Sequence, residues 1–398
     1  MEQLTESPLA GPTFHAEEQI TFAIAGETRS ELVRWYVARL REALERQGHL
    51  PRPMQTLRIA DALTDDNGLD LADQVRLVIN QADLDRPRSI RRAGQGTFVV
   101  TIVEGRDDEA EVMSAAYPVL VRSLSNMVIF NTRAAGVLES HFITIEQGHY
   151  IVRQTGDERT FFDEVLGRIR PLACSHLVIN NEFAPDLPPA LWQGDDVTQQ
   201  IGWAGRKLDQ LGLLPSVVPI DRLLSERDLR HVKRLYNMGG LSYGNLSGRA
   251  LHDPSCFWMS ASGVDKSRLE TVGRDILLVT GYDPARLLMR LSVPANVEPR
   301  RVSVDAIEHW MIYREHPDVG AIVHVHGWWR DPIPSTQVNY PCGTYELAAE
   351  VAELVRQAPD PSRAVIGLKN HGLTITGHSI REIFERVEGM IVPQVPMS

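Results

Sequence analysis

The run Ala321-Ile-Val-His-Val-His-Gly327 is the feature that most constrains how this chain folds. Side chains alternate between the two faces of a β-strand, so His324 and His326 share one face while Val323 and Val325 pack on the other. Two imidazoles on one face of a strand can bind a single metal ion. A structural pair with satisfied hydrogen bonds fits the same pattern equally well, so the metal interpretation needs a third histidine.

His371 is the candidate for that third histidine. It follows the apolar run 364–368 in Lys369-Asn-His-Gly372, where the glycine lets the backbone turn close to a site. Three neutral imidazoles with one open position are a common catalytic zinc arrangement. The other ten of the 13 histidines show no comparable pairing, and we interpret them as surface or capping residues.

The overall composition is typical of a soluble globular protein, with 43% hydrophobic and 23% charged residues. The net charge of −11 argues against nucleic acid as a partner, so small molecules are expected instead. No segment approaches the roughly 20 uninterrupted apolar residues of a membrane span, and the N-terminus lacks a signal-peptide pattern. We therefore expect a cytoplasmic protein with no membrane partner. The three cysteines, Cys174, Cys256 and Cys342, form no CxxC pair and are expected to be free thiols.

The length of 398 residues favours two domains, because one domain usually spans about 100 to 200 residues. In the N-terminal half, Thr28 is a candidate N-cap for a long amphipathic helix, and strand-like and helical runs alternate between about 97 and 185. This alternation predicts a separate α/β domain. A proline-rich stretch from 183 to about 219 is typical of an inter-domain connection, so we divide the chain into residues 1–212, of unknown role, and 213–398.

Seven ordered motifs in the C-terminal half resemble the class II aldolase/adducin family, which includes fuculose-phosphate aldolase, ribulose-phosphate epimerase and methylthioribulose-phosphate dehydratase. The resemblance covers about 175 residues. It implies an α/β/α domain with a central, mainly antiparallel sheet. The motifs are the helix Asp228 to Met238 with Gly244-Asn-Leu-Ser-Gly-Arg249, then Ser260-Ala-Ser-Gly-Val-Asp-Lys266, Ser303-Val-Asp305 with His309, Tyr313-Arg-Glu-His-Pro-Asp318, the His-Val-His pair, Tyr340-Pro-Cys-Gly-Thr-Tyr-Glu-Leu347 and Lys369-Asn-His-Gly372.

The resemblance also implies roles for individual residues. His324, His326 and His371 are implied to bind Zn²⁺ or another divalent metal such as Mn²⁺ or Co²⁺. Asp305 lies 19 residues before His324, at the spacing of the family's catalytic acid, and is implied to be a base or ligand. Capping of the helix 306–315 is the alternative role for Asp305. The family's phosphate-binding loops correspond to residues for which plain turns are the alternative: Gly244, Asn245, Ser262, Gly263 and Ser303.

Two departures from the family pattern bear on the substrate. Val304 replaces the second serine of the Ser-Ser-acid motif, so one phosphate-binding hydroxyl is missing. Only 16 residues separate His326 from Gly343, where family members usually have a helix and a long loop, so we expect Trp328, Trp329 and Arg330 to rebuild the pocket wall there.

We therefore predict a metal-dependent lyase that acts on a small hydroxy-carbonyl compound, sugar-derived or phosphorylated, through a metal-stabilised enediolate. The reaction is an aldolase-type cleavage or formation of a C–C bond, a decarboxylation or a dehydration. A sugar epimerase with the same metal site and a non-catalytic, adducin-like scaffold are the alternatives. The family resemblance also implies a homo-oligomer.

Overall fold

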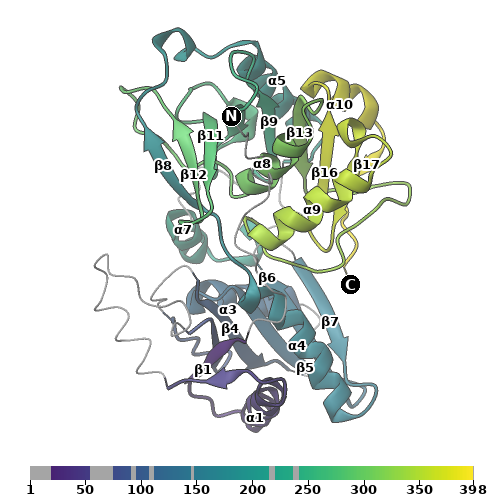
Figure 1. The fold of residues 1–398 in the computed structure, drawn as a ribbon. Helices are drawn as coiled ribbons and strands as arrows, with labels where there is room; N and C mark the ends of the chain where they lie inside the picture. The colour runs from purple at the N-terminus through teal and green to yellow at the C-terminus, as the bar shows by residue number, and fades with distance from the viewer. Residues whose placement is uncertain are drawn as a thin grey trace, which may run out of the picture. The chain divides into compact units, whose positions relative to one another are not determined.

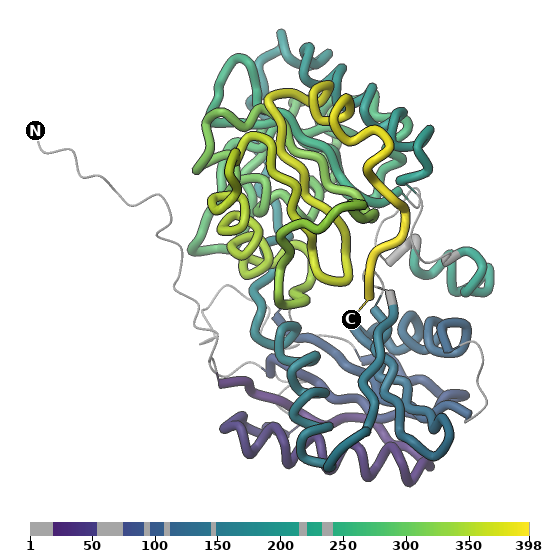
Figure 2. The backbone as a smooth tube through the Cα atoms, turned by 90° about the vertical axis from the view of Figure 1, so that its right-hand side faces the viewer, coloured from purple at the N-terminus to yellow at the C-terminus, as the bar shows by residue number. Residues whose placement is uncertain are grey.

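The protein divides into two compact units in its computed structural model. The N-terminal unit reaches Ser175 and also includes residues 219–232, whereas the C-terminal unit is built from residues 176–218 and 233–396. Figure 2 traces the chain from purple through teal to yellow. The structure describes residues 19–53, 75–90, 96–106, 112–144, 148–214, 220–235 and 242–397.

The N-terminal unit is built on a seven-stranded sheet with the strand order β2-β1-β3-β4-β5-β6-β7. The first five strands in that order are parallel, and β6 and β7 extend the sheet as an antiparallel hairpin. Nearly every residue of β3 and β4 is buried, as expected for parallel strands covered on both faces. The strands are β1 Thr21–Gly26, β2 Leu50–Pro51, β3 Leu77–Gln81, β4 Phe98–Glu104, β5 Met127–Ala134, β6 Val137–Thr144 and β7 Gly148–Arg153.

The helices of this unit are α1 (Glu31–Arg46), α3 (Val112–Ser123), α4 (Glu158–Cys174) and the short α6 (Ile220–Leu223) and α7 (Glu226–Leu235). Together with the sheet they confirm the predicted α/β fold of the N-terminal half. The predicted N-cap of α1 was wrong, because Ser30, not Thr28, accepts the bond from Val33 N. The hydroxyl of Thr28 instead donates to Asp83 Oδ1 at 2.7 Å.

The C-terminal unit contains an eight-stranded sheet with the order β15-β16-β13-β9-β10-β11-β12-β8 (Figure 1). All neighbouring strands are antiparallel except β12 and β8, so the predicted mainly antiparallel sheet is confirmed. A separate two-stranded sheet joins β14 (Trp328–Trp329) to β17 (Ile391–Val392). The eight strands are β8 Asn180–Ala184, β9 Asn245–Arg249, β10 Phe257–Ser260, β11 Ile276–Asp283, β12 Leu288–Ser292, β13 Ala321–Val325, β15 Val365–Leu368 and β16 Gly372–Gly377.

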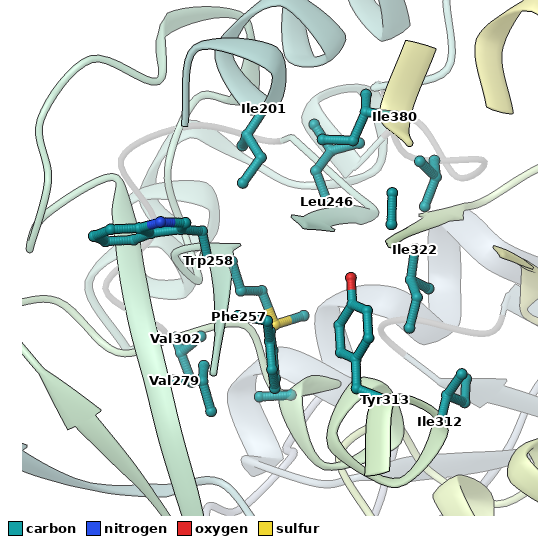
Figure 3. Close-up of a cluster of buried hydrophobic side chains, with 14 of the residues drawn as sticks. Ile201, Leu246, Phe257, Trp258, Val279, Val302, Ile312, Tyr313, Ile322 and Ile380 are labelled. Carbon is teal, nitrogen blue, oxygen red and sulfur yellow. The ribbon is translucent and has the colours of Figure 1, made fainter. Parts of the chain in front are cut away.

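Helices cover both faces of this sheet, which gives the α/β/α arrangement. Helix α5 (Asp196–Gln210) packs against β9, α10 (Ile380–Val387) packs against β13, and the two helices contact each other. Helices α8 (Ala306–Glu315) and α9 (Tyr345–Gln357) also contact each other, and they pack against β11 and β15 respectively. Figure 3 shows Ile201 of α5 and Ile380 of α10 beside Leu246, and Tyr313 of α8 on the other side of the strand. The core is therefore formed from both faces of the sheet.

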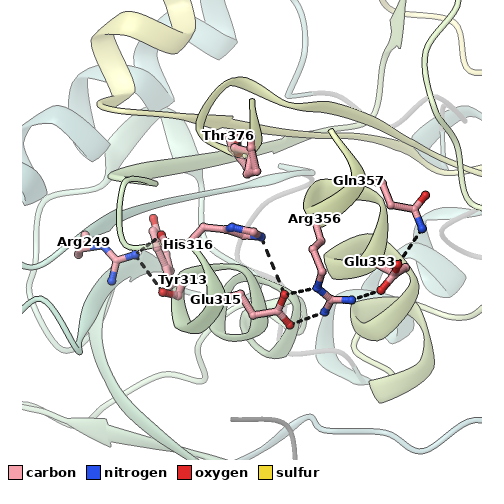
Figure 4. A network of polar contacts seen from close by, with 9 residues as sticks. Arg249, Tyr313, Glu315, His316, Glu353, Arg356, Gln357 and Thr376 are labelled. Atoms are coloured by element: carbon pink, nitrogen blue, oxygen red, sulfur yellow. Dashed lines mark hydrogen bonds and ion pairs between the residues drawn. The ribbon is translucent and has the colours of Figure 1, made fainter. Parts of the chain in front are cut away.

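Two arginines hold the C-terminal end of α8 in place. Arg249 donates from its guanidinium to the carbonyl oxygens of Tyr313 and His316 at the end of the helix, where basic side chains commonly bind the last carbonyl groups. Arg356 of α9 forms a bidentate pair with Glu315, with N···O distances of 2.9 and 2.7 Å (Figure 4). These contacts anchor α8 at its C-terminal end.

The division that we predicted at residue 212/213 differs from the one in the structure, at 175/176. Strand β8 pairs with β12 in the C-terminal sheet, and α5 lies against β9 and β10, so both elements belong to the C-terminal unit. In contrast, α7 lies in the N-terminal unit, where Asp228 pairs with Arg122 at 2.8 Å. The motif helix predicted from 228 to 238 is described only to Leu235, and its last residues lie outside the described ranges.

Across the described ranges, no helix combines the length and the hydropathy that a membrane-spanning segment requires.

The position of α5 gives a test that uses two helical glycines. A Cβ atom added at Gly205 of α5 would lie 1.8 Å from the carbonyl oxygen of Lys266, so Gly205→Ala should lower the free energy of unfolding by about 1–3 kcal/mol. A Cβ atom added at Gly167 of α4 meets nothing within 4 Å, so Gly167→Ala should raise stability by about 0.4–1 kcal/mol. Urea unfolding followed by circular dichroism measures both effects. A fully stable Gly205→Ala variant would contradict the packing of α5 on the C-terminal unit.

Candidate metal centre

The central strand β13 carries His324 between two antiparallel neighbours. In the register of the sheet, His324 lies opposite Asn245 of β9 and Thr374 of β16. All five residues of β13 are buried, and the side chain of His324 is only 2% exposed. The strand therefore places this imidazole inside the protein, with polar residues of both neighbouring strands beside it.

His371 reaches the same place from the turn between β15 and β16. Asn370 adopts a positive φ of 60°, a conformation that asparagine tolerates better than most residues, and His371 N donates to Leu368 O at 3.0 Å. A Cβ atom on Gly372 would lie 2.2 Å from Val325 O, so only glycine allows this close approach to the end of β13. The Asn-His-Gly sequence is thus explained by local backbone geometry.

The three histidines predicted from the sequence come together. One ligand atom from each of His324, His326 and His371 lies within 4.8 Å of the other two, and all three side chains are buried. Nε2 of His324 and Nε2 of His371 are 3.1 Å apart. Two nitrogen ligands of one tetrahedral zinc ion are about 3.3 Å apart, given Zn–N bonds of about 2.0–2.1 Å. The donor set therefore fits a divalent metal ion.

The hydrogen bonds around these rings are also suited to metal binding. Nδ1 of His324 donates to Leu373 O at 3.0 Å, which leaves the lone pair of its Nε2 directed toward His371. His326 is 7% exposed, and its ring lies against that of His371, with 4.4 Å between the ring centroids. Burial lowers the pKa of all three rings, and neutral imidazole is the form that binds metals.

Asp305 lies beside this group and does not cap α8. It occupies the position before the helix, but its side chain makes no capping hydrogen bond. Instead, Asn245 Nδ2 donates to Asp305 Oδ2 at 2.7 Å, and the aspartate is 8% exposed. The Asp305 carboxylate opposes the effect of burial on the pKa of His324, so the two groups lie within electrostatic range. The capping alternative is therefore not supported.

The residues predicted to form anion-binding loops lie in two neighbouring loops and at the start of β9. Ala261 and Val302 form a β-bridge, Ser262 N donates to Arg301 O at 2.9 Å and Ser303 N donates to Ser260 O at 3.2 Å. Gly263 and Gly244 both have positive φ, 68° and 73°. A Cβ atom on Gly244 would lie 2.4 Å from His324 O. Packing therefore requires a glycine at this position, with or without a role in ligand binding.

Four further polar residues near the site were given no site role from the sequence. Lys266 is 3% exposed, donates from Nζ to Ser242 O at 2.7 Å, and has its pKa lowered to about 8 by burial, an effect that Asp305 opposes. Burial lowers the pKa of His309 to about 3, and its Nδ1 contacts Ser247 Oγ at 2.7 Å. Glu308 follows Asp305 by three residues, one turn along the same helix, and that spacing was a signal available in the sequence. The fourth residue is Cys342.

Glu308 is a buried acid that is kept protonated. It is 2% exposed, and Thr374 Oγ1 donates to its Oε1 at 2.5 Å. Burial, and then the neighbouring Asp305 carboxylate, raise its pKa to about 8. The folded state consequently binds this proton more tightly than the unfolded state, in which a glutamate titrates near 4.3.

This proton gives a pH-dependent prediction for the metal-free protein. An acid whose pKa is raised by folding stabilises the native state only while it is protonated, so stability falls as the pH rises above about 4.3 towards the folded pKa of about 8. Glu308→Gln removes the titration and should be more stable than the wild type by at least about 1 kcal/mol at pH 8, with a smaller difference at pH 5. Urea unfolding at both pH values measures this. The exposed Glu385 of α10 is the control, and a Glu308→Gln effect equal to that of Glu385→Gln at both pH values would exclude the buried proton.

Residues 230–329 match the family model "Class II Aldolase and Adducin N-terminal domain". No curated protein matches the chain. Among solved structures, the chain is similar to YgbL from Klebsiella pneumoniae, with 18% identity over 48% of this chain and 84% of that chain and a TM-score of 0.32.

Two further solved structures are similar at the same level. An L-fuculose 1-phosphate aldolase is 21% identical, with 49% of this chain and 83% of that chain covered and a TM-score of 0.33. L-fuculose 1-phosphate aldolase from Glaciozyma antarctica PI12 is 18% identical, with 47% and 66% covered and a TM-score of 0.31. The family-model match includes Asp305, His324 and His326 and ends before His371.

Proposed function

We propose that the protein is a metal-dependent lyase that acts on a small hydroxy-carbonyl compound. The observation that carries this proposal is the convergence of three buried imidazoles next to a buried carboxylate that caps no helix. The proposed reactions are aldolase-type cleavage or formation of a C–C bond, decarboxylation and dehydration. All of these place negative charge on carbon and on an adjacent oxygen, and all need a group that moves a proton.

His324, His326 and His371 would hold the ion, with Zn²⁺ as the first candidate and Mn²⁺ or Co²⁺ as alternatives. When bound, a divalent ion supplies Lewis-acid stabilisation of negative charge that develops on a substrate oxygen. The three rings contribute no charge of their own, because burial lowers the pKa of each. Their low exposure also keeps water away from the reacting atoms.

Asp305 is the group that we assign to proton transfer. Its Oδ2 accepts from Asn245 Nδ2 at 2.7 Å, which fixes the orientation of the carboxylate. A positioned carboxylate can take a proton from a substrate hydroxyl or carbon and return it later in the reaction. The amide of Asn245 is itself fixed by the register of β9 with His324, so base and imidazole are positioned by the same pair of strands.

An unpaired acceptor supports a substrate that carries hydroxyl groups. Oδ1 of Asn245 is buried and has no hydrogen-bond partner among the described residues. A buried acceptor left unpaired costs about 1–3 kcal/mol, and a hydroxyl of the substrate would remove that cost. We propose that Gly244, Ser262, Gly263 and Ser303 contact the substrate next to this amide. Val304 offers no hydroxyl there, so a phosphate would be bound by fewer side chains than in the family.

The metal site leads to a prediction of the metal content of the protein. The purified protein should contain close to one Zn²⁺ or similar divalent ion per chain, and His324→Ala combined with His326→Ala should abolish this binding because two of three ligands are lost. Elemental analysis and zinc titration measure the metal content. His252 is exposed, and His252→Ala should bind the metal as the wild type does. A wild-type protein that takes up neither zinc, cobalt nor manganese would refute the catalytic proposal and favour a scaffold.

Asp305→Asn tests the assignment of the base. Asparagine keeps the size of the side chain but is not basic, so turnover should fall by about 10²- to 10⁴-fold, the usual contribution of a positioned general base. Metal content should stay near that of the wild type. If Asp305 is a ligand, metal binding should weaken together with turnover.

The matched control for this variant is Asp209→Asn, because Asp209 is an exposed residue of α5. The control should leave both metal content and turnover unchanged. An Asp305→Asn variant with full turnover on the identified substrate would show that another group moves the proton.

A further inference from the structure

Lys266 is a buried cation near the candidate metal centre. It is one of only four lysines in the chain, and it is 3% exposed. Lysine is rarely buried to this extent unless its charge is paired. Among the described residues, its Nζ forms one hydrogen bond, to Ser242 O at 2.7 Å, and no ion pair. An ammonium group has three N–H donors, so two of them remain for a ligand.

The surroundings of this ammonium group do not compensate its burial. Desolvation lowers the pKa of Lys266 to about 8, although the carboxylates of Asp305 and Asp265 act in the opposite direction. The group is therefore still protonated at pH 7, and it carries its charge inside the protein. A buried charge without a close partner is costly, and a ligand of opposite charge would remove that cost.

The contacts of Lys266 define where its side chain lies. Its backbone N donates to Ser242 Oγ at 3.0 Å and its Nζ donates to Ser242 O, so one serine binds both ends of the residue. Helix α5 packs so closely that a Cβ atom on Gly205 would lie 1.8 Å from Lys266 O. The side chain therefore reaches the segment 242–244, which leads into β9.

This segment connects Lys266 to the histidines. The ring centroids of Tyr243 and His326 are 5.2 Å apart, and Gly244 packs against the carbonyl oxygen of His324. Burial is the main cause that lowers the pKa of His324 and His326, and the positive charge of Lys266 adds to this effect. The contacts and the electrostatics thus agree that Lys266 belongs to the same site.

We propose that Lys266 binds a carboxylate group of the substrate, so that the hydroxy-carbonyl substrate of this site is also a carboxylic acid. This inference rests on the proposed function and narrows its substrate class. The two N–H donors of Nζ that Ser242 does not use would donate to the carboxylate, and hydrogen bonds between charged groups are the strong ones. Lys266 would thereby select for an anionic substrate.

A carboxylate fits this position better than a phosphate. One ammonium group neutralises the single charge of a carboxylate, whereas a phosphate monoester brings about 1.5 to 2 negative charges at pH 7. Among the buried residues of the described ranges, Lys266 is the only lysine or arginine. Val304 also lacks the hydroxyl that would bind a phosphate oxygen. The charges and donors of the site therefore match a carboxylate.

The test is anion binding to the metal-free full-length protein, measured by isothermal titration calorimetry at pH 7. Glycolate, a small hydroxy acid, is the carboxylate probe, and inorganic phosphate and neutral ethylene glycol are compared with it. We expect glycolate to bind the wild type. Lys266→Met and Lys266→Gln should bind it about 10- to 100-fold more weakly, because a hydrogen bond between charged groups is lost.

Lys207 of α5 provides the matched control. Its side chain is 30% exposed, and its Nζ lies 3.9 Å from Glu388 Oε1. Lys207→Met removes the same charge at a different place, so it should bind glycolate as the wild type does. Circular dichroism shows whether each variant is folded.

The possible results separate this inference from the proposed function. A wild type that does not bind glycolate, or Lys266 variants that bind it equally well, would overturn the inference and leave the metal site intact. An equal loss in Lys207→Met would also overturn it, because net charge would then explain the effect. Tighter binding of phosphate that depends on Lys266 would replace the carboxylate by a phosphate ester. A protein that binds glycolate through Lys266 but takes up no metal would refute the metal-dependent lyase and keep the anion site.

A measurement on the wild type decides the question if neither Lys266 variant folds. Reductive methylation followed by mass spectrometry gives the reaction rate of each lysine. Glycolate should slow the methylation of Lys266 and leave that of Lys207 unchanged. Rates at Lys266 that do not change with glycolate would overturn the inference.

Discussion

The close approach of three backbone segments at the end of β13 is the constraint on which the candidate site depends. Gly244 and Gly372 lie on either side of this strand, and a Cβ atom on either would lie 2.4 Å or less from a β13 carbonyl oxygen. Larger residues would push β9 and β16 outward. His371 and Asn245, which adjoin these glycines, would then move away from His324. The positions of the chemical groups thus follow from a steric condition on the backbone.

The same condition creates an unusual concentration of buried polar groups. Asp305, Glu308 and Lys266 are each at most 8% exposed, and they lie within electrostatic range of one another or of the histidines. Burial disfavours the charged forms of Glu308, Lys266 and the histidine rings, so Glu308 keeps its proton and the rings stay neutral. A site of this kind has few net charges before a ligand arrives. An incoming cation therefore meets neutral nitrogen ligands and one oriented carboxylate.

Much of the site was predictable from the sequence, because its main signals are local. Strand alternation placed His324 and His326 on one face, and the glycine after His371 indicated a close turn. The spacing of Asp305 came from the family resemblance and did not decide between a base and a helix cap. The side-chain contact with Asn245, which is 60 residues away in the chain, speaks against the cap. The contact of Cys342 with His371 also depends on the fold, because two separate loops bring the residues together.

The domain division could not be predicted from composition, because it also depends on contacts that only the fold creates. Pro185 directly follows the end of β8, but it does not show which sheet that strand joins. None of the residues of strand β8 is buried, as is typical of an edge strand, yet its backbone pairs with all five residues of β12. An edge strand pairs mainly through backbone hydrogen bonds, which the pattern of side chains in the sequence does not reveal. The position of a domain boundary in a chain of this kind therefore follows from strand pairing, and a proline-rich segment is compatible with either unit.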